Sequence, residues 1–115
     1  MFLKFGRYNM NTKQRLLDFF EAENKRDWIS YRKYLAKDVL WTLHSDNEKT
    51  ICGIDCYIMK EYEENNNTFV CESLYQSKDG DLIVTILKNN IGKRSCDIFE
   101  FKGGLIIKEY EFIID

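Results

Sequence analysis

The chain of 115 residues contains no proline and a single histidine. Proline confines a strand to the edge of a sheet, so its absence leaves every apolar run free to be a central strand. No run reaches the roughly 18 apolar residues of a membrane-spanning helix, and we expect no membrane partner. The start lacks the pattern of a signal peptide, which predicts a cytoplasmic location.

An excess of charge of either sign is also missing. The 17 basic and 19 acidic residues give a net charge of −2, without a long block of like charge. Nucleic-acid-binding proteins carry a basic surface, so we expect no nucleic-acid partner. The charges at Lys25, Arg26, Arg32, Lys33 and 61–64 are interpreted as solvated helix faces.

Metal-ligand motifs are absent. The four cysteines have no C-x-x-C spacing, and the lone His44 cannot complete a zinc site without three well-placed thiolates. We therefore expect no metal and no cofactor. A chain of this length buries roughly two thirds of its unfolded surface in one core, so it needs no disulfide framework. Four reduced, mostly buried thiols are the expectation.

Residues 1–10 are interpreted as an N-terminal arm and residues 11–115 as a single domain. One hypothesis makes Met10 the natural first residue, with Gly6 and Arg7 encoded by a purine-rich ribosome-binding sequence read in frame. The alternative is an ordinary N-terminal arm.

Apolar residues recur every three or four positions in three segments, which predicts helices over Asn11–Arg26, Asp27–Leu35 and Gly53–Glu64. Asn11 and Gln14 are expected to form a capping box at the first start, and Asp27 to cap the second.

Alternating apolar runs predict strands over Val39–His44, Thr68–Ser77 and Leu82–Lys88. A polar loop is expected between the first strand and the third helix. The Asp-Gly pair between the other two strands predicts a hairpin turn.

The last twenty residues, CDIFEFKGGLIIKEYEFIID, predict a second hairpin turning at Gly103-Gly104. Counting outward from that turn places Asp97 opposite Tyr110 on a largely aromatic face. The same count pairs Phe101 with Ile106 and Phe99 with Lys108. A β-bulge in the last strand would instead bring Glu109 or Glu111 beside Asp97, because a one-residue slip reverses facing.

The unbulged register assigns the other face to Ile98, Glu100, Ile107, Glu109 and Glu111, a set too charged to be wholly buried in a monomer.

Helices that precede a run of antiparallel strands predict an α+β domain. Three N-terminal helices should pack on a strongly curved antiparallel sheet and close a cone-shaped barrel. The mouth of such a cone can admit a small ligand.

Three strings in this order carry a resemblance to a known family: AKDVLWTLHS, Gly53-Ile54-Asp55, and CDIFEFKGGLIIKEYEF. From about residue 11 onward the chain resembles the nuclear transport factor 2-like superfamily, and within it the SnoaL-like proteins. The resemblance implies a cystatin-like cone with a pocket between helices and sheet. It also implies a homodimer formed through the outer sheet face. Members include ketosteroid isomerases, polyketide cyclases and dehydratases, and proteins that only bind ligands or partners.

Of three functional positions of ketosteroid isomerases, the resemblance implies that this chain keeps one and lacks two. The acid that hydrogen-bonds a developing oxyanion in ketosteroid isomerases falls on Asp97, before the Phe-x-Phe of the penultimate strand. Their general base falls on Leu43 and their helix-one tyrosine on Phe19. Steroid isomerase chemistry is therefore not expected.

Two residues are candidates for acid/base work. Asp97 is the expected hydrogen-bond donor or acid, with a pKa raised by apolar walls. Its alternative is a structural carboxylate. His44 is the only obvious base, because its ordinary pKa lies near physiological pH, although alternation turns it away from Leu43. The residues expected to contact a ligand, or else to form core, are Phe19, Trp41, Leu43, Tyr57, Phe99 and Tyr110.

We therefore expect a pocket for a small apolar or carbonyl-bearing molecule, with or without cofactor-free acid/base catalysis of the isomerase, cyclase or dehydratase type. The alternative is a non-catalytic dimerisation or protein-interaction module whose pocket is filled. A cavity lined by Asp97 favours the first, and a cavity filled by Trp41, Phe99 and Phe101 the second.

Overall fold

A computed structural model describes residues 11–64 and 67–115. The predicted arm over residues 1–10, and with it the question of the natural start, lies outside the described residues. None of the described helices has the length and apolarity of a membrane span.

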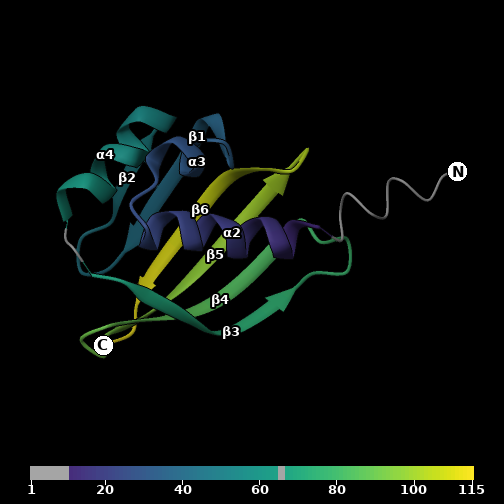
Figure 1. Ribbon diagram of the computed structural model, residues 1–115. Coiled ribbons are helices and arrows are strands. Elements are labelled where there is room, and N and C mark those ends of the chain that lie inside the picture. Colours follow the sequence, from purple (N-terminus) through teal and green to yellow (C-terminus); the bar gives the residue numbers. More distant parts are fainter. Residues whose placement is uncertain (1–10, 65–66) are drawn as a thin grey trace, which may run out of the picture.

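Within residues 11–64 and 67–115, three helices and six strands follow one another (Figure 1). The helices are α2 (Thr12–Asn24), α3 (Trp28–Arg32) and α4 (Ile54–Glu64). The strands are β1 (Leu35–His44), β2 (Lys49–Cys52), β3 (Phe69–Gln76), β4 (Leu82–Asn89), β5 (Arg94–Lys102) and β6 (Leu105–Ile113).

The strands form one sheet in the order β2-β1-β6-β5-β4-β3. Helix α2 lies across this sheet, and α3 and α4 lie toward its β1–β2 end (Figure 1). The predicted α+β cone fold is confirmed. The sheet is mixed and not antiparallel throughout, because β1 runs parallel to β6. It is not closed, because β2 and β3 at its two ends do not pair with each other. The chain enters β1 from the helices and β6 from the final hairpin, so the two strands share a direction.

Helix starts were predicted with mixed success. Asp27 caps α3 as expected, accepting a hydrogen bond from the Ser30 backbone N–H at 3.2 Å. The capping box at Asn11 is wrong: the Asn11 side chain makes no capping hydrogen bond. Gln14 instead donates to Asp18 at 2.9 Å, one turn further along the helix.

Strand β2 was missed, because the segment predicted as a polar loop ends in a short strand. Lys49–Cys52 pairs antiparallel with β1, where Ile51 lies opposite Trp41. A four-residue edge strand that starts Lys-Thr has too few apolar residues to show alternation. Strand β1 also begins earlier than predicted, at Leu35, because α3 ends at Arg32.

The final hairpin turns where expected, since Gly103 and Gly104 have φ of 59° and 81°. Phe101 lies opposite Ile106 as predicted. Beyond that pair the register shifts, so that Glu100 lies opposite Lys108.

The shift makes the predicted pairs further along the hairpin wrong. Asp97 lies opposite Glu111, and Phe99 lies opposite Glu109. The bulge adds one residue to β6, and the added residue reverses the facing of everything after it. Glu109 is thus buried, 5% exposed, instead of lying on the outer face.

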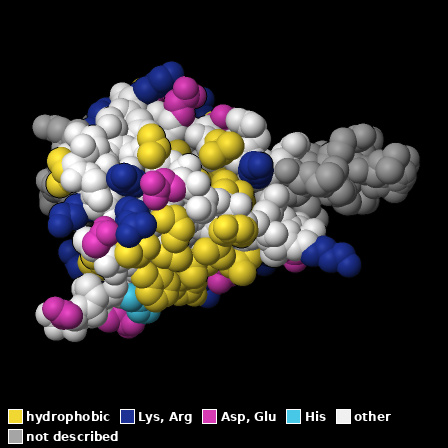
Figure 2. Space-filling model, turned by 90° about the horizontal axis from the view of Figure 1, so that it is seen from below, with side chains coloured by type: hydrophobic (Ala, Val, Ile, Leu, Met, Phe, Trp, Pro, Cys, Tyr) yellow, Lys and Arg dark blue, Asp and Glu magenta, His cyan; other side chains and the backbone are white. Residues whose placement is uncertain are grey.

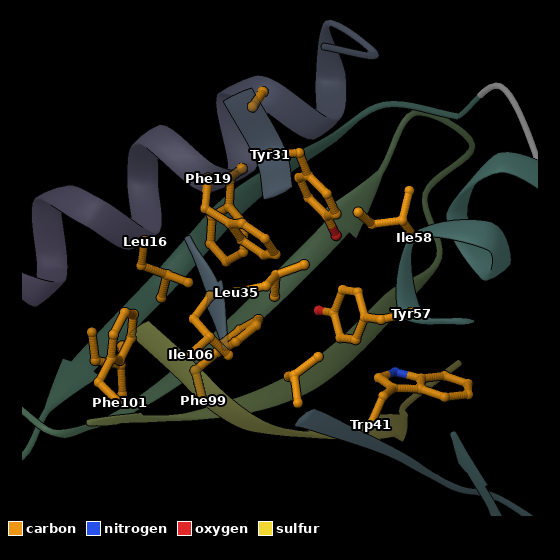
Figure 3. Close-up of a cluster of buried hydrophobic side chains, with 14 residues drawn as sticks. Leu16, Phe19, Tyr31, Leu35, Trp41, Tyr57, Ile58, Phe99, Phe101 and Ile106 are labelled. Carbon is orange, nitrogen blue, oxygen red and sulfur yellow. The ribbon is translucent and has the colours of Figure 1, made fainter. Parts of the chain in front are cut away.

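The core lies between the helices and the inner face of the sheet (Figure 3). Phe19 of α2 stacks on Tyr31 of α3, with ring centroids 4.2 Å apart. Leu16, Val39, Ile83 and Ile106 are fully buried around them.

All four cysteines are free, as expected. The expectation that most are buried is wrong. Cys52 and Cys56 are exposed, and Cys71 and Cys96 are partly so.

Leu16→Ala is expected to lower the free energy of unfolding by about 3 kcal/mol, because it removes a fully buried side chain and leaves a cavity. Ile29→Ala, at a position 78% exposed, is the matched control and should change it by less than about 0.5 kcal/mol. Urea unfolding of both variants checks this, and equal losses would contradict the assigned core.

Candidate functional site

A cavity of about 190 Å³ opens between the helices and the sheet strands β5 and β6. Its apolar wall is aromatic and includes Phe19, Phe20, Phe69 and Phe99. Its polar wall carries six carboxyl groups and four basic groups. The acids are Glu23, Glu61, Asp97, Glu109, Glu111 and Asp115, and the bases are Arg26, Lys60, Lys93 and Arg94. A small cavity lined by so many acids must hold protons or cations to be stable.

Asp97 of β5 faces this cavity and is only 3% exposed. The Ser95 hydroxyl donates to its carboxyl at 2.5 Å. Burial, together with a hydrogen bond to Glu109 and the charge of that group, raises the pKa of Asp97 well above its usual range. Asp97 therefore keeps its proton where an exposed aspartate has lost it, and it can donate to Glu109.

Glu109 and Glu111 of β6 each accept a hydrogen bond from an aromatic residue. The Tyr57 hydroxyl donates to Glu109, and burial raises the pKa of Tyr57 well above its usual value, so this donor stays protonated. The indole N–H of Trp41 donates to Glu111 at 3.1 Å. Burial and the charge of Glu109 raise the pKa of Glu111 to about 7.

A second pair of carboxyl groups joins α2 to α4. Burial, then the charge and hydrogen bond of Glu61, raise the pKa of Glu23 well above its usual value. Burial opposes ionisation of Glu61 as well, but the charge of Lys60 and its hydrogen bond, with that of Glu23, outweigh it and lower the pKa of Glu61. The Tyr31 hydroxyl also donates to Glu23, at 2.8 Å. Figure 3 shows the hydroxyls of Tyr31 and Tyr57 pointing into the space between the helices and the sheet.

Asp97, Glu109 and Glu111 also have the geometry of a hard-cation site, because one ligand oxygen of each lies within 4.8 Å of the other two. Each of the three carboxyl groups already accepts a hydrogen bond, from Ser95, Tyr57 and Trp41 respectively. The arrangement suits groups that share protons.

The structure brings together three of the residues singled out in the sequence. Asp97, Phe19 and Phe99 line the cavity. Trp41 and Tyr57 act from behind it, as the donors to Glu111 and Glu109.

Leu43, His44 and Tyr110 are not among the cavity-lining residues. Leu43 packs against the edge of the core. His44 lies 3.0 Å from Glu48 through Nδ1, and its ring stacks on Phe112 at 4.6 Å. Tyr110 lies opposite Ile98, one residue out of phase with Asp97. Neither His44 nor Tyr110 is therefore placed to meet a ligand beside Asp97.

Sequence reasoning missed Glu23, Glu61 and Lys60, and it placed Glu109 or Glu111 beside Asp97 only for a bulged hairpin. Glu61 was interpreted as part of a solvated helix face, yet its side chain is 12% exposed, and that of Lys60 is 7% exposed. The signal that could have found Glu23 is its spacing, since it lies three and four residues after the buried Phe20 and Phe19.

No protein-family profile and no curated protein matches the sequence. Solved structures do match the fold. One is a nuclear transport factor 2-like protein of unknown function from Cytophaga hutchinsonii, 15% identical, with a TM-score of 0.78 over 90% of this chain and 89% of that one.

Two further structures carry names of enzymes. A candidate ketosteroid isomerase from Kribbella flavida is 20% identical, with a TM-score of 0.80 over 92% of this chain and 79% of that one. The epoxide hydrolase/cyclase-like enzyme SalBIII, of pyran ring formation in the polyether salinomycin, is 14% identical, with a TM-score of 0.75 over 91% and 92%. The chain therefore has the nuclear transport factor 2-like fold that its sequence resembles.

Proposed function

We propose that this chain is a SnoaL-like small-molecule protein that carries out cofactor-free acid/base chemistry in the cavity beside Asp97. The observation that carries the proposal is a pair of carboxyl groups, Asp97 and Glu111, that line one cavity and lie opposite each other in β5 and β6. The pKa of Asp97 is raised well above its usual range, and that of Glu111 is raised to about 7. Two carboxyl groups whose environments separate their roles in this way are the usual basis of an acid and base pair.

Asp97 is the proposed hydrogen-bond donor. A neutral carboxyl in an apolar site can donate to an oxyanion as it develops on a bound carbonyl compound. Glu111 is the proposed base, because a base works best when its pKa lies near the operating pH. This assignment replaces His44, which hydrogen-bonds away from the cavity.

The size and walls of the cavity support a small ligand. At about 190 Å³ it is below the roughly 300 Å³ at which drug-sized pockets begin. Phe19 and Phe99 offer ring surface for an apolar part. The filled-pocket alternative is less favoured, because Phe99 borders open space and does not fill it.

The similar structures support the class of chemistry only in part. An isomerase and a cyclase are among the names that those proteins carry. This chain has Leu43 where the resemblance places the isomerase base, so a steroid isomerase reaction is not proposed.

4-Nitrophenol is a probe for the proposed donor, because its phenolate resembles an enolate oxyanion. Asp97→Leu is expected to weaken its binding at least tenfold, because leucine has no donor and a hydrogen bond to a charged oxygen is worth about 1.5–3 kcal/mol. Titration followed by the phenolate absorbance band measures this. Glu100→Gln, on the same strand and away from the cavity, is the matched control and should bind like the unaltered protein. Equal affinity in Asp97→Leu would defeat the assignment.

Glu111 also predicts how stability depends on pH. Its folded pKa of about 7 lies above the ordinary value of 4.5, so the folded state binds more protons than the unfolded one. The resulting stability is present at low pH and is lost as pH rises toward 7. Between pH 4.5 and 7.5 the unaltered protein should lose roughly 2–3 kcal/mol more than Glu111→Gln does. Urea unfolding across this range tests the sign, and the same pH slope in both proteins would refute it.

We also propose that the outer face of the sheet holds a second copy of this chain. Alternation turns one row of side chains on β3–β6 away from the core, namely Tyr75, Val84, Ile98 and Tyr110, in register with one another. Figure 2 shows hydrophobic side chains gathered beside the histidine with few charges among them. A patch with few charges can face the same patch of a second copy without repulsion between like charges, as a two-fold interface requires.

Ile98→Glu is expected to convert a dimer to a monomer, because it would bury two uncompensated charges at the centre of the interface. Light scattering after size-exclusion chromatography measures the mass. Ile29→Glu, on α3 at a position 78% exposed, should leave the dimer intact. A monomeric unaltered protein would count against the interface.

A further inference from the structure

Lys60 is a buried cation at the back of the cavity. Lys60 is 8% exposed, and it is the only buried Lys or Arg among residues 11–61 and 67–115. The ammonium nitrogen lies 2.7 Å from a carboxylate oxygen of Glu61. A lysine is seldom buried unless it is paired, because removing its charge from water is costly.

The same nitrogen lies over two aromatic rings, 4.4 Å from the ring centroid of Trp41 and 4.6 Å from that of Tyr57. Both distances are within the range of cation–π attraction. These two rings belong to different elements, β1 and α4, and one ammonium group contacts both.

Both aromatic side chains donate a hydrogen bond to a glutamate that lines the cavity. Trp41 donates to Glu111 and Tyr57 donates to Glu109. Lys60 therefore contacts the donor to Glu111 and the donor to Glu109, and these two rings link it to both glutamates of β6.

We propose that Lys60 is a positioning residue, which aims the Trp41 and Tyr57 donors at Glu111 and Glu109 and whose charge keeps Glu111 able to act as a base at neutral pH. The catalytic part of this inference rests on the function proposed above, whereas the structural part does not. Lys60 is not among the positions that the family resemblance singles out.

The charges around Glu111 fix the direction of the effect. Burial and the negative charges of Glu109 and Glu61 raise the pKa of Glu111, and Lys60 and the Trp41 hydrogen bond lower it. The other ionisable groups that line the cavity are Glu23 and Arg26 of the α2 region, Asp97 of β5, and Lys93, Arg94 and Asp115 at the mouth. Removing the Lys60 charge leaves burial and Glu109 less opposed, so the pKa of Glu111 should rise above 7.

The indole N–H of Trp41 reports on Glu111 directly, because it donates to that carboxyl group. Its resonance in a nitrogen–proton NMR spectrum should titrate with a midpoint near pH 7 in the unaltered protein. In Lys60→Met the midpoint should rise by about 1 pH unit, the shift expected from losing a nearby opposite charge. Lys60→Arg keeps the charge and should bring the midpoint closer to that of the unaltered protein than Lys60→Met does.

The experiment has two controls. The chain has one other tryptophan, Trp28, which packs on Tyr31 and is not a cavity-lining residue. Its indole resonance should not follow the Lys60 substitutions. Lys60→Gln is measured alongside Lys60→Met, so that a folding defect of one neutral variant does not remove the test.

An unchanged or lower midpoint in both neutral variants would overturn the proposal, and so would a shift in Lys60→Arg as large as that in Lys60→Met. The NMR midpoint needs no ligand. A protein that shows the Lys60-dependent midpoint but fails to bind 4-nitrophenol would therefore keep the role of Lys60 and lose the proposed function. The reverse result would lose only the role of Lys60.

Discussion

The cavity chemistry depends on one extra residue in strand β6. The register shift between the Phe101–Ile106 and Glu100–Lys108 pairs turns Glu109 inward, where an unbulged hairpin would put it in water. Because strand facing alternates with a period of two, a single insertion decides which row of β6 meets the core. Without the bulge, Asp97 would lie beside a tyrosine and the cavity would contain one acid from the final hairpin in place of three.

Burying so many carboxyl groups is tolerable only because protons, a cation and hydrogen bonds compensate their charges. Asp97 and Glu23 hold protons and hydrogen-bond to Glu109 and Glu61 respectively. Lys60 supplies the compensating positive charge. Tyr31, Tyr57 and Trp41 donate further hydrogen bonds to these carboxyl groups. Among the described residues no buried side-chain nitrogen or oxygen lacks a partner. Such a network is costly if any member is missing, so its members form one unit.

The fold itself does not determine the reaction. Proteins with this fold and 14–20% identity to the chain carry names as different as a candidate ketosteroid isomerase and an epoxide hydrolase/cyclase-like enzyme. The resemblance places the isomerase base at Leu43, which does not line the cavity of this chain, whereas Glu111 of β6 does.

The sequence alone determined the features that depend on local pattern: the three helices, the Gly103-Gly104 turn, the Asp27 cap and the inward position of Asp97. It also predicted that a bulge would exchange Tyr110 for Glu109 or Glu111. Only the tertiary structure decided that the bulge is present, because strand register is set by how side chains pack across the sheet. The burial of Glu61 and Lys60 was likewise decided there, since helical spacing shows which residues share a face but not which face meets the core.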